Sequence, residues 1–84
     1  MSLPYYTDEA GRVIERATGL RLGRVDEVTY RPVTGDGIYV PRDVEGEPLG
    51  RPTMLRSIAM LRVVRAARPG VEITLWDIDE RPIR

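Results

Sequence analysis

The side chains best placed by this sequence to bind a ligand are three arginines, Arg62, Arg65 and Arg68. They fall in a stretch that predicts a helix, so they share one helix face within about 120°. A stripe of guanidinium groups can contact phosphates. However, the formal net charge of the chain is 0, and no aromatic residues alternate with the arginines to stack on bases. A small DNA- or RNA-binding regulator is therefore the alternative function, with these three arginines as possible phosphate contacts.

Carboxylates gather near the end of the chain, at Asp77, Asp79 and Glu80. Their oxygens are ligands that Mg²⁺ and Ca²⁺ accept, but the spacing is not that of an EF-hand loop. We interpret them as a solvated acidic segment after a strand, and we expect no metal site and no cofactor.

The residue types argue against most catalytic chemistry. The chain has no histidine and no cysteine, and all 13 basic residues are arginine. The commonest general base, a thiolate nucleophile and a Schiff-base lysine are therefore absent. A tyrosine or a carboxylate could donate a proton, but no spacing selects one. We expect a non-catalytic protein, and an enzyme or small-ligand binder is the third possibility.

The strongest structural signal lies between Pro52 and Ile78. Pro52 suits the first turn of a helix, good helix formers follow as far as Arg68, and Pro69-Gly70 ends the helix. Val71–Ile78 then predicts a strand, with Ile73 and Leu75 on its buried face.

The predicted helix is apolar on two sides. At about 100° per residue, an early group and a late group of apolar residues lie on roughly opposite faces. The early group is Met54, Leu55, Ile58 and Leu61, and the late group is Met60, Val63, Val64 and Ala67. The late face should pack on the sheet, which leaves the early face in need of a cover. We expect a second chain to supply it, although a central helix with arginine stems along its apolar surface is the alternative. The predicted interaction surface comprises Met54, Leu55, Ile58, Leu61, Trp76 and Ile78.

Residues 7–18 predict a second helix. Thr7 can cap it, Asp8 and Arg12 form a favourable pair four residues apart, and Gly19 can end it. Gly11 is the weak point of this helix. Tyr6-Thr7-Asp8-Glu9-Ala10-Gly11-Arg12-Val13 also resembles one unit of a YD repeat, in which such a stretch forms a β-hairpin. That family uses many copies and this chain has one, so the hairpin is the alternative.

Two strands and a loop are predicted between the helices. Leu22–Val33 is a strand whose alternation slips, which predicts a bulge near Asp26-Glu27. The turn Thr34-Gly35-Asp36-Gly37 leads to a strand at Ile38–Val40. Leu22-Gly23-Arg24-Val25 and Pro32-Val33-Thr34-Gly35 resemble the opening hairpin of a PRC-barrel domain, a family that continues in strands where this chain predicts a helix. Residues 42–51 are rich in Gly, Pro and acidic residues and predict a surface loop, with Leu49 as its anchor.

These elements predict a single small α+β domain over residues 1–84. With a short strand at Ser2–Tyr6, the order is βαββαβ, as in ferredoxin-like folds, with two helices on one face of an antiparallel sheet. Without that strand the order is αββαβ. The predicted function is a non-catalytic protein-interaction module, a homo-oligomer or a subunit of a larger assembly, whose partner is itself or another protein. No signal peptide or membrane span is recognisable, so we expect a cytoplasmic protein with no membrane partner.

Overall fold

The computed structural model describes residues 2–31 and 36–81. These residues form five β-strands, one α-helix and one turn of 3-10 helix. The strands are β1 (Tyr5–Thr7), β2 (Arg12–Glu15), β3 (Arg21–Arg31), β4 (Asp36–Arg42) and β5 (Ile78–Asp79). The helix α1 covers Arg56–Ala67, and the 3-10 turn η1 covers Leu75–Asp77.

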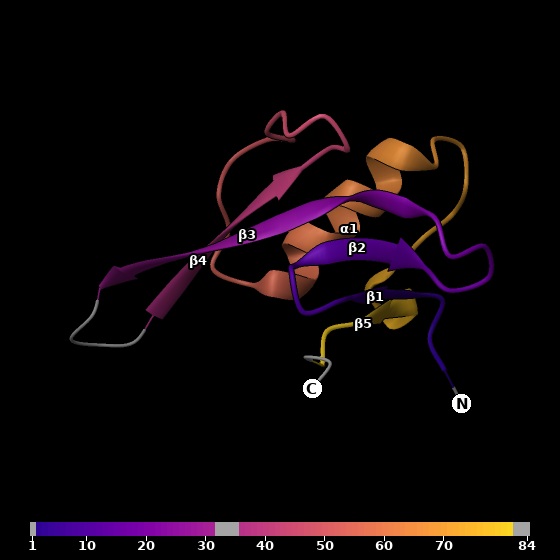
Figure 1. The fold of residues 1–84 in the computed structure, drawn as a ribbon, viewed down its shortest axis with the longest axis horizontal. Coiled ribbons are helices and arrows are strands. Elements are labelled where there is room, and N and C mark those ends of the chain that lie inside the picture. The colour runs from indigo at the N-terminus through magenta and orange to yellow at the C-terminus, as the bar shows by residue number, and fades with distance from the viewer. Residues whose placement is uncertain (1, 32–35, 82–84) are drawn as a thin grey trace.

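The five strands form one mixed sheet in the order β4-β3-β2-β1-β5. Neighbouring strands are antiparallel except β1 and β5, which are parallel. The sheet curls into a half-barrel, and α1 packs against it (Figure 1). The expected antiparallel sheet with two helices in ferredoxin-like βαββαβ order is therefore wrong. The αββαβ alternative fails for the same reason, because it also needs a helix before β3, where the described chain has strands.

The β1–β2 hairpin replaces the helix expected at residues 7–18. The carboxylate of Asp8 folds the turn, since its Oδ1 accepts hydrogen bonds from the backbone N–H groups of Ala10 (3.0 Å) and Arg12 (2.9 Å). Such local bonding competes with helix formation. The Asp8–Arg12 ion pair expected along a helix does form, with Nε to Oδ2 at 2.6 Å, but it closes the hairpin turn. The hairpin alternative for residues 6–13 is therefore the correct one.

Gly11 explains why these residues form a hairpin turn and not a helix. Its φ angle is +81°, which an L side chain rarely adopts, and a Cβ at this position would lie 2.6 Å from the carbonyl oxygen of Val25. The residue that weakens a helix is thus the one that the turn requires.

The β3–β4 hairpin follows the prediction more closely. Residues from Arg24 to Thr29 pair in regular register with β4, and the shift in this pairing lies between Thr29 and Arg31. The bulge expected near Asp26-Glu27 is therefore wrong, because Val25 is buried in the core while Val28 faces solvent, as a regular strand requires. The expected turn at 34–37 begins outside the described residues, and Asp36 and Gly37 belong to β4.

The helix α1 begins later than the sequence suggested. Thr53 pairs with Tyr39 of β4 instead, through two backbone hydrogen bonds of 2.7 and 2.9 Å. Leu49 donates its N–H to the carbonyl of Pro41, so the segment before α1 covers the outer edge of β4. The helix ends before Pro69-Gly70, as expected.

The core lies between the sheet and α1, and Leu49 packs against it from the loop. The late helix face faces this core, since Met60, Val63 and Val64 are fully buried. The buried apolar cluster comprises Tyr5, Val13, Leu22, Val25, Ala59, Met60, Leu61, Val63, Val64, Ile73 and Ile78. Gly23 of β3 permits the close contact, because a Cβ there would overlap the carbonyl oxygen of Arg42 and lie 2.6 Å from Cγ1 of Val63.

The strand expected at Val71–Ile78 is mostly absent. Ile73 is buried as predicted, but Leu75 belongs to η1 and is 45% exposed, so its predicted burial is wrong. Only Ile78 and Asp79 pair in the sheet, beside Tyr5 and Tyr6 of β1. The physical reason is local: Thr74 and Asp77 form a reciprocal capping box, which favours one helical turn over an extended strand.

Candidate functional site

Several large apolar side chains stand in solvent, in η1 and just before α1. Trp76 is 87% exposed, and Leu75 beside it is 45% exposed. Met54 and Leu55, just before α1, are 68% and 60% exposed. Trp76 is the only tryptophan in the chain, and an indole in water gives up a large favourable burial. This exposure is the most unusual feature of the described surface.

The position of Trp76 is fixed by hydrogen bonds rather than by packing of its ring. The hydroxyl of Thr74 accepts from the N–H of Trp76 (3.3 Å), and the carboxylate of Asp77 accepts from the N–H of Thr74 (2.9 Å). The buried side chains of Ile73 and Ile78 anchor the backbone on both sides. We call residues 74–77 the Trp76 turn. It holds the indole outward on a short, well-bonded segment.

An apolar groove of about 370 Å³ lies where the second half of α1 meets the start of β3 and the loop after β4. Its apolar lining comprises Leu20, Leu22, Val44, Leu49, Val63, Ala66 and Ala67. Leu20 and Val44 are exposed at this groove. Arg21, Asp43 and Arg68 supply its charged groups. The groove can therefore receive an apolar side chain.

The six residues predicted as an interaction surface do not form one patch. Met54, Leu55 and Trp76 are exposed, Ile58 is half-buried, and Leu61 and Ile78 belong to the core. The domain thus covers part of the early helix face itself, with Ile73 in the same buried cluster as Leu61. The sequence reasoning missed Leu20, Val44 and Leu75. The sequence did contain a signal that Val44 is exposed, because Val44 lies among Gly, Pro and acidic residues, where no core element forms.

The three arginines of the predicted phosphate stripe each donate to the protein itself. Arg62 donates to the carbonyl of Arg51 (2.6 Å), and Arg65 donates twice to the carbonyl of Ile73 (2.9 and 3.2 Å). Arg68 forms a two-bond pair with the carboxylate of Glu15, at 2.9 Å for each bond. These contacts join α1 to the segments around it.

The Glu15–Arg68 pair has a clear electrostatic signature. Hydrogen bonds from the Arg68 guanidinium, and then from the Thr18 hydroxyl, lower the pKa of Glu15 from 4.5 to about 2. The pKa of Arg68 is raised in turn, chiefly by its bonds to Glu15. The pair joins β2 to the end of α1 across a long sequence separation.

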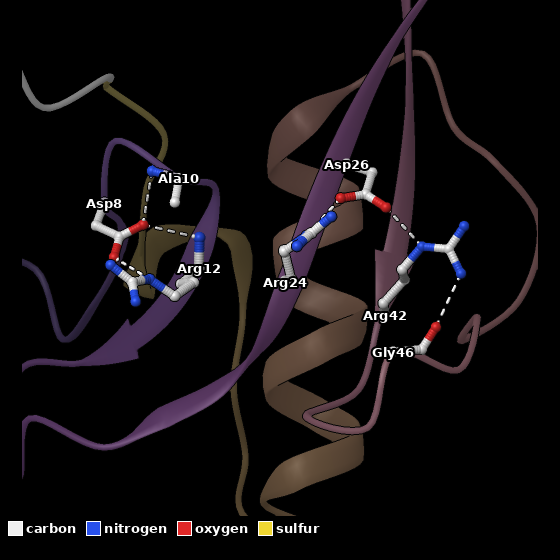
Figure 2. A network of polar contacts seen from close by, with 7 residues as sticks. All are labelled: Asp8, Ala10, Arg12, Arg24, Asp26, Arg42 and Gly46. Carbon is white, nitrogen blue, oxygen red and sulfur yellow. Dashed lines mark hydrogen bonds and ion pairs between the residues drawn. The ribbon is translucent and has the colours of Figure 1, made fainter.

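A second depression, which we call the polar cleft, lies between the β1–β2 turn, β3, β4 and the first turn of α1. It has a volume of about 330 Å³. Two of its carboxylates are already paired (Figure 2): Asp8 with Arg12, and Asp26 with both Arg24 and Arg42. Bonds from Arg24, and then from Arg42, lower the pKa of Asp26 against the effect of its burial. Burial opposes ionisation of Asp8, but the bonds from Arg12 and Ala10 outweigh it and lower its pKa.

The rest of the polar cleft holds Thr7, Glu27, Tyr39 and Arg56. Thr7 is 2% exposed. The Tyr39 hydroxyl donates to Glu27 over a long 3.4 Å, and burial, with the nearby Glu27 charge, raises the pKa of Tyr39. These groups can bind a small polar molecule or water. A tyrosine whose pKa is raised is a poor general base near neutral pH.

The carboxylates after η1 have structural partners. Asp77 caps the Trp76 turn, and Asp79 forms ion pairs with Arg81 (3.1 Å) and Arg16 (3.7 Å). Within residues 2–31 and 36–81, no group of three or more acidic side chains is placed to hold a metal ion. In the same residues, α1 is too short and too polar to cross a membrane, and so is every other helix.

The chain was compared with protein-family models, with curated proteins and with solved structures. Neither the likeness to the YD repeat nor that to the PRC-barrel domain is supported by a family match. None of the three comparisons found a match to this chain.

Proposed function

We propose that this chain is a non-catalytic protein-interaction module that binds a second protein chain through the Trp76 turn. The observation that carries the proposal is the outward, hydrogen-bonded display of Trp76. Tryptophan is among the residues that most often dominate binding energy at protein interfaces. The hydrogen bonds hold the backbone that carries the indole before binding, so less backbone freedom is lost in the complex.

The surroundings of Trp76 support the same role. Leu75 adds a second exposed apolar side chain next to it, and Val71 is exposed shortly before the turn. Glu72 and Glu80, which flank the Trp76 turn in sequence, are exposed polar residues. An apolar centre with a polar rim is the usual anatomy of a protein interface. The lack of histidine, cysteine and lysine favours binding over catalysis.

Photo-crosslinking tests the proposal. A photoreactive phenylalanine analogue replaces Leu75, and the protein is irradiated in the cells that encode it. We expect one defined crosslinked protein, identified by mass spectrometry, which is either a second copy or a different chain. The matched control carries the analogue at Glu9, an exposed residue of the β1–β2 turn, and should not give this product.

A second variant connects the crosslink to Trp76. Adding Trp76→Asp to the Leu75 probe should abolish the product, because a carboxylate in place of the indole removes the apolar anchor. The side chain is already in solvent, so the change should leave the melting temperature nearly unaltered. A product that persists in this variant, or that forms equally from position 9, would contradict the proposed function.

A further inference from the structure

We propose that the polar cleft binds a free α-amino acid, with the ammonium group of the ligand at Glu27 and its carboxylate at Arg56. Both residues line the cleft, and no residue of the Trp76 turn does. The site therefore adds a small-molecule ligand to the proposed function. Three features of the cleft support this assignment: its place on the sheet, a buried hydroxyl group without a partner, and two opposite charges that are not paired with each other.

The cleft lies on the side of the sheet that carries the core. Thr7 pairs with the buried Val13, so both side chains point to this side. Glu27 lies two residues after the buried Val25 and pairs with Tyr39, so it shares this side as well. The first residue of α1 also lines the cleft. Its volume of about 330 Å³ is near the lower end of the range for small-molecule sites, about 300–1,000 Å³, so the ligand is small.

Thr7 supplies a buried hydroxyl group that the protein itself does not use. The residue is 2% exposed, and its hydroxyl forms no hydrogen bond within residues 2–31 and 36–81. No side-chain oxygen or nitrogen in this part of the chain is both sealed from solvent and without a partner. The small surface that Thr7 retains therefore includes its oxygen, and Thr7 lines the cleft. An unpaired buried hydroxyl group is costly, and a ligand in the cleft can satisfy it.

Glu27 and Arg56 present opposite charges to the cleft. Burial and the Glu27 charge raise the pKa of the Tyr39 hydroxyl, whereas the Arg56 charge lowers it, so both charges lie near this group. Among the described residues, neither Glu27 nor Arg56 takes part in an ion pair. Glu27 accepts only the long 3.4 Å bond from Tyr39. A ligand that carries both an ammonium group and a carboxylate matches these two open charges.

The start of α1 favours the carboxylate of the ligand at Arg56. The N-terminus of this helix has no side-chain cap and no acidic residue in its first turn. A negative group at such a place is stabilised by the helix dipole, and a guanidinium group can bind a carboxylate through two parallel hydrogen bonds. The α-carboxylate of an amino acid meets both conditions.

The other carboxylates of the cleft compete little for the ammonium group. Asp8 is paired with Arg12, and Asp26 is shared by two arginines (Figure 2). Glu9 lines the cleft as well, but its side chain is exposed, so solvent screens its charge. Glu27, beside the hydroxyl of Tyr39, is therefore the carboxylate left to bind the ammonium group.

Titration of the isotope-labelled protein, followed by NMR, tests the site. The ligands are L-alanine, L-leucine, L-aspartate and L-arginine, because the geometry leaves the side chain of the ligand open. We expect at least one of them to shift the backbone amide signals of Thr7, Glu27, Tyr39 and Arg56 with a single dissociation constant. Acetate and ethylamine each carry one of the two charges, and both should bind at least about tenfold more weakly.

Thr7→Val separates binding from folding. The variant replaces the hydroxyl group with a methyl group of similar size. Affinity for the amino acid should fall by about 3–10-fold, while the melting temperature stays the same or rises, since an unpaired buried polar group is removed. A hydroxyl with only a structural role would give the reverse, a lower melting temperature with unchanged binding.

The two charges are tested one at a time. Glu27→Gln and Arg56→Gln should each weaken binding of the amino acid by at least about tenfold. Arg56→Gln should also weaken acetate, and Glu27→Gln should weaken ethylamine. The matched controls Glu45→Gln and Arg51→Gln change exposed residues outside the cleft and should bind like the wild type. The proposal is overturned if none of the four amino acids binds more tightly than acetate and ethylamine, or if binding is unaltered in both cleft variants.

Discussion

Some single residues in this protein form contacts between segments that lie far apart in the sequence, and the neighbouring residues in sequence do not indicate these contacts. Glu15 reaches Arg68 at the end of α1, and Gly23 provides the space for Val63. Both connections link the sheet to the helix. Each gives a prediction that one substitution can test.

The first prediction concerns Glu15 and acid. Its pKa is lowered in the folded protein from 4.5 to about 2, so the unfolded chain binds this proton more readily. The stabilisation it provides is complete above about pH 4.5 and is lost as the pH falls towards about 2. Glu15→Gln should therefore be less stable than the wild type near neutral pH, and the two should converge as the pH approaches about 2. Urea unfolding of both proteins across this range measures the difference.

The comparison with the variant is necessary because other carboxylates titrate in the same direction. The pKa values of Asp8, Asp26 and Asp79 are also lowered, so the wild type loses stability in acid for several reasons. Only the difference between the two proteins reports Glu15. If the difference in unfolding free energy between the two proteins does not change with pH, the charge of the Glu15 ion pair contributes nothing to stability.

The second prediction concerns Gly23. Gly23→Ala should lower the free energy of unfolding by about 1–3 kcal/mol or more, because overpacking forces the backbone of β3 away from its neighbours. The new methyl group would overlap the carbonyl oxygen of Arg42 and crowd Val63. Gly37→Ala is the matched control in the neighbouring strand, since its nearest contact would be an ordinary 3.4 Å. Equal melting temperatures for the two variants would refute this account.

At the scale of elements, the β1–β2 hairpin shows where reading the sequence fails. Residues 7–18 satisfy both a helical pattern and a hairpin, and the Asp8–Arg12 pair fits either one. Whether a helix or a hairpin forms depends on Gly11, which lies against Val25. This contact joins two segments, so no local sequence pattern contains it. Similarly, Thr74 and Asp77 form a capping box that gives one helical turn in place of the strand predicted at Val71–Ile78, although the alternation of apolar residues there predicts an extended segment.

The elements predicted well are those whose signals are local and unopposed. The end of α1 at Pro69-Gly70, the buried face at Met60, Val63 and Val64, and the pairing of β3 with β4 all follow from the sequence. Of the residues predicted as an interaction surface, Met54, Leu55 and Trp76 are exposed. Trp76 was named, but the groove is built from three separate segments, so no spacing along the chain could reveal it.

The third prediction belongs to the hairpin. Asp8→Ala should lower the free energy of unfolding by about 1 kcal/mol, since the turn loses the acceptor of two backbone hydrogen bonds and an ion pair. The neighbouring Glu9→Ala removes the same charge from an exposed side chain and should change stability by less than about 0.5 kcal/mol. Thermal unfolding of the two variants provides the measurement. An equal loss for both would attribute the effect to net charge rather than to the turn.

At the scale of the whole molecule, the stability of the fold depends on one small core. A domain of 84 residues has a free energy of unfolding of about 4–13 kcal/mol. The core consists of one side of a curled sheet, one helix and the segment around Ile73. A single large loss in this core is therefore a large fraction of the total.

The fourth prediction compares two methionines. Met60→Ala should cost about 2–5 kcal/mol, because Met60 is fully buried between the sheet and α1. Met54→Ala makes the same chemical change at a side chain that is 68% exposed, so its unfolding free energy should stay within about 0.5 kcal/mol of the wild type. Chemical denaturation at a concentration where the protein is monomeric separates the two. A destabilised Met54→Ala would mean that the start of α1 is packed more tightly than the structure shows.

The parallel pairing of β1 with β5 also implies an order in which the elements form during folding. Tyr5 and Ile78 meet in the sheet from near the two ends of the chain, whereas the β1–β2 and β3–β4 hairpins join close neighbours. Closing so long a loop is entropically expensive and slow, and only two residues of β5 hold it closed. The hairpins and α1 should form first and the β1–β5 seam last. The same seam should open first in the native protein, so the Trp76 turn that precedes it is joined to the most transient part of the sheet.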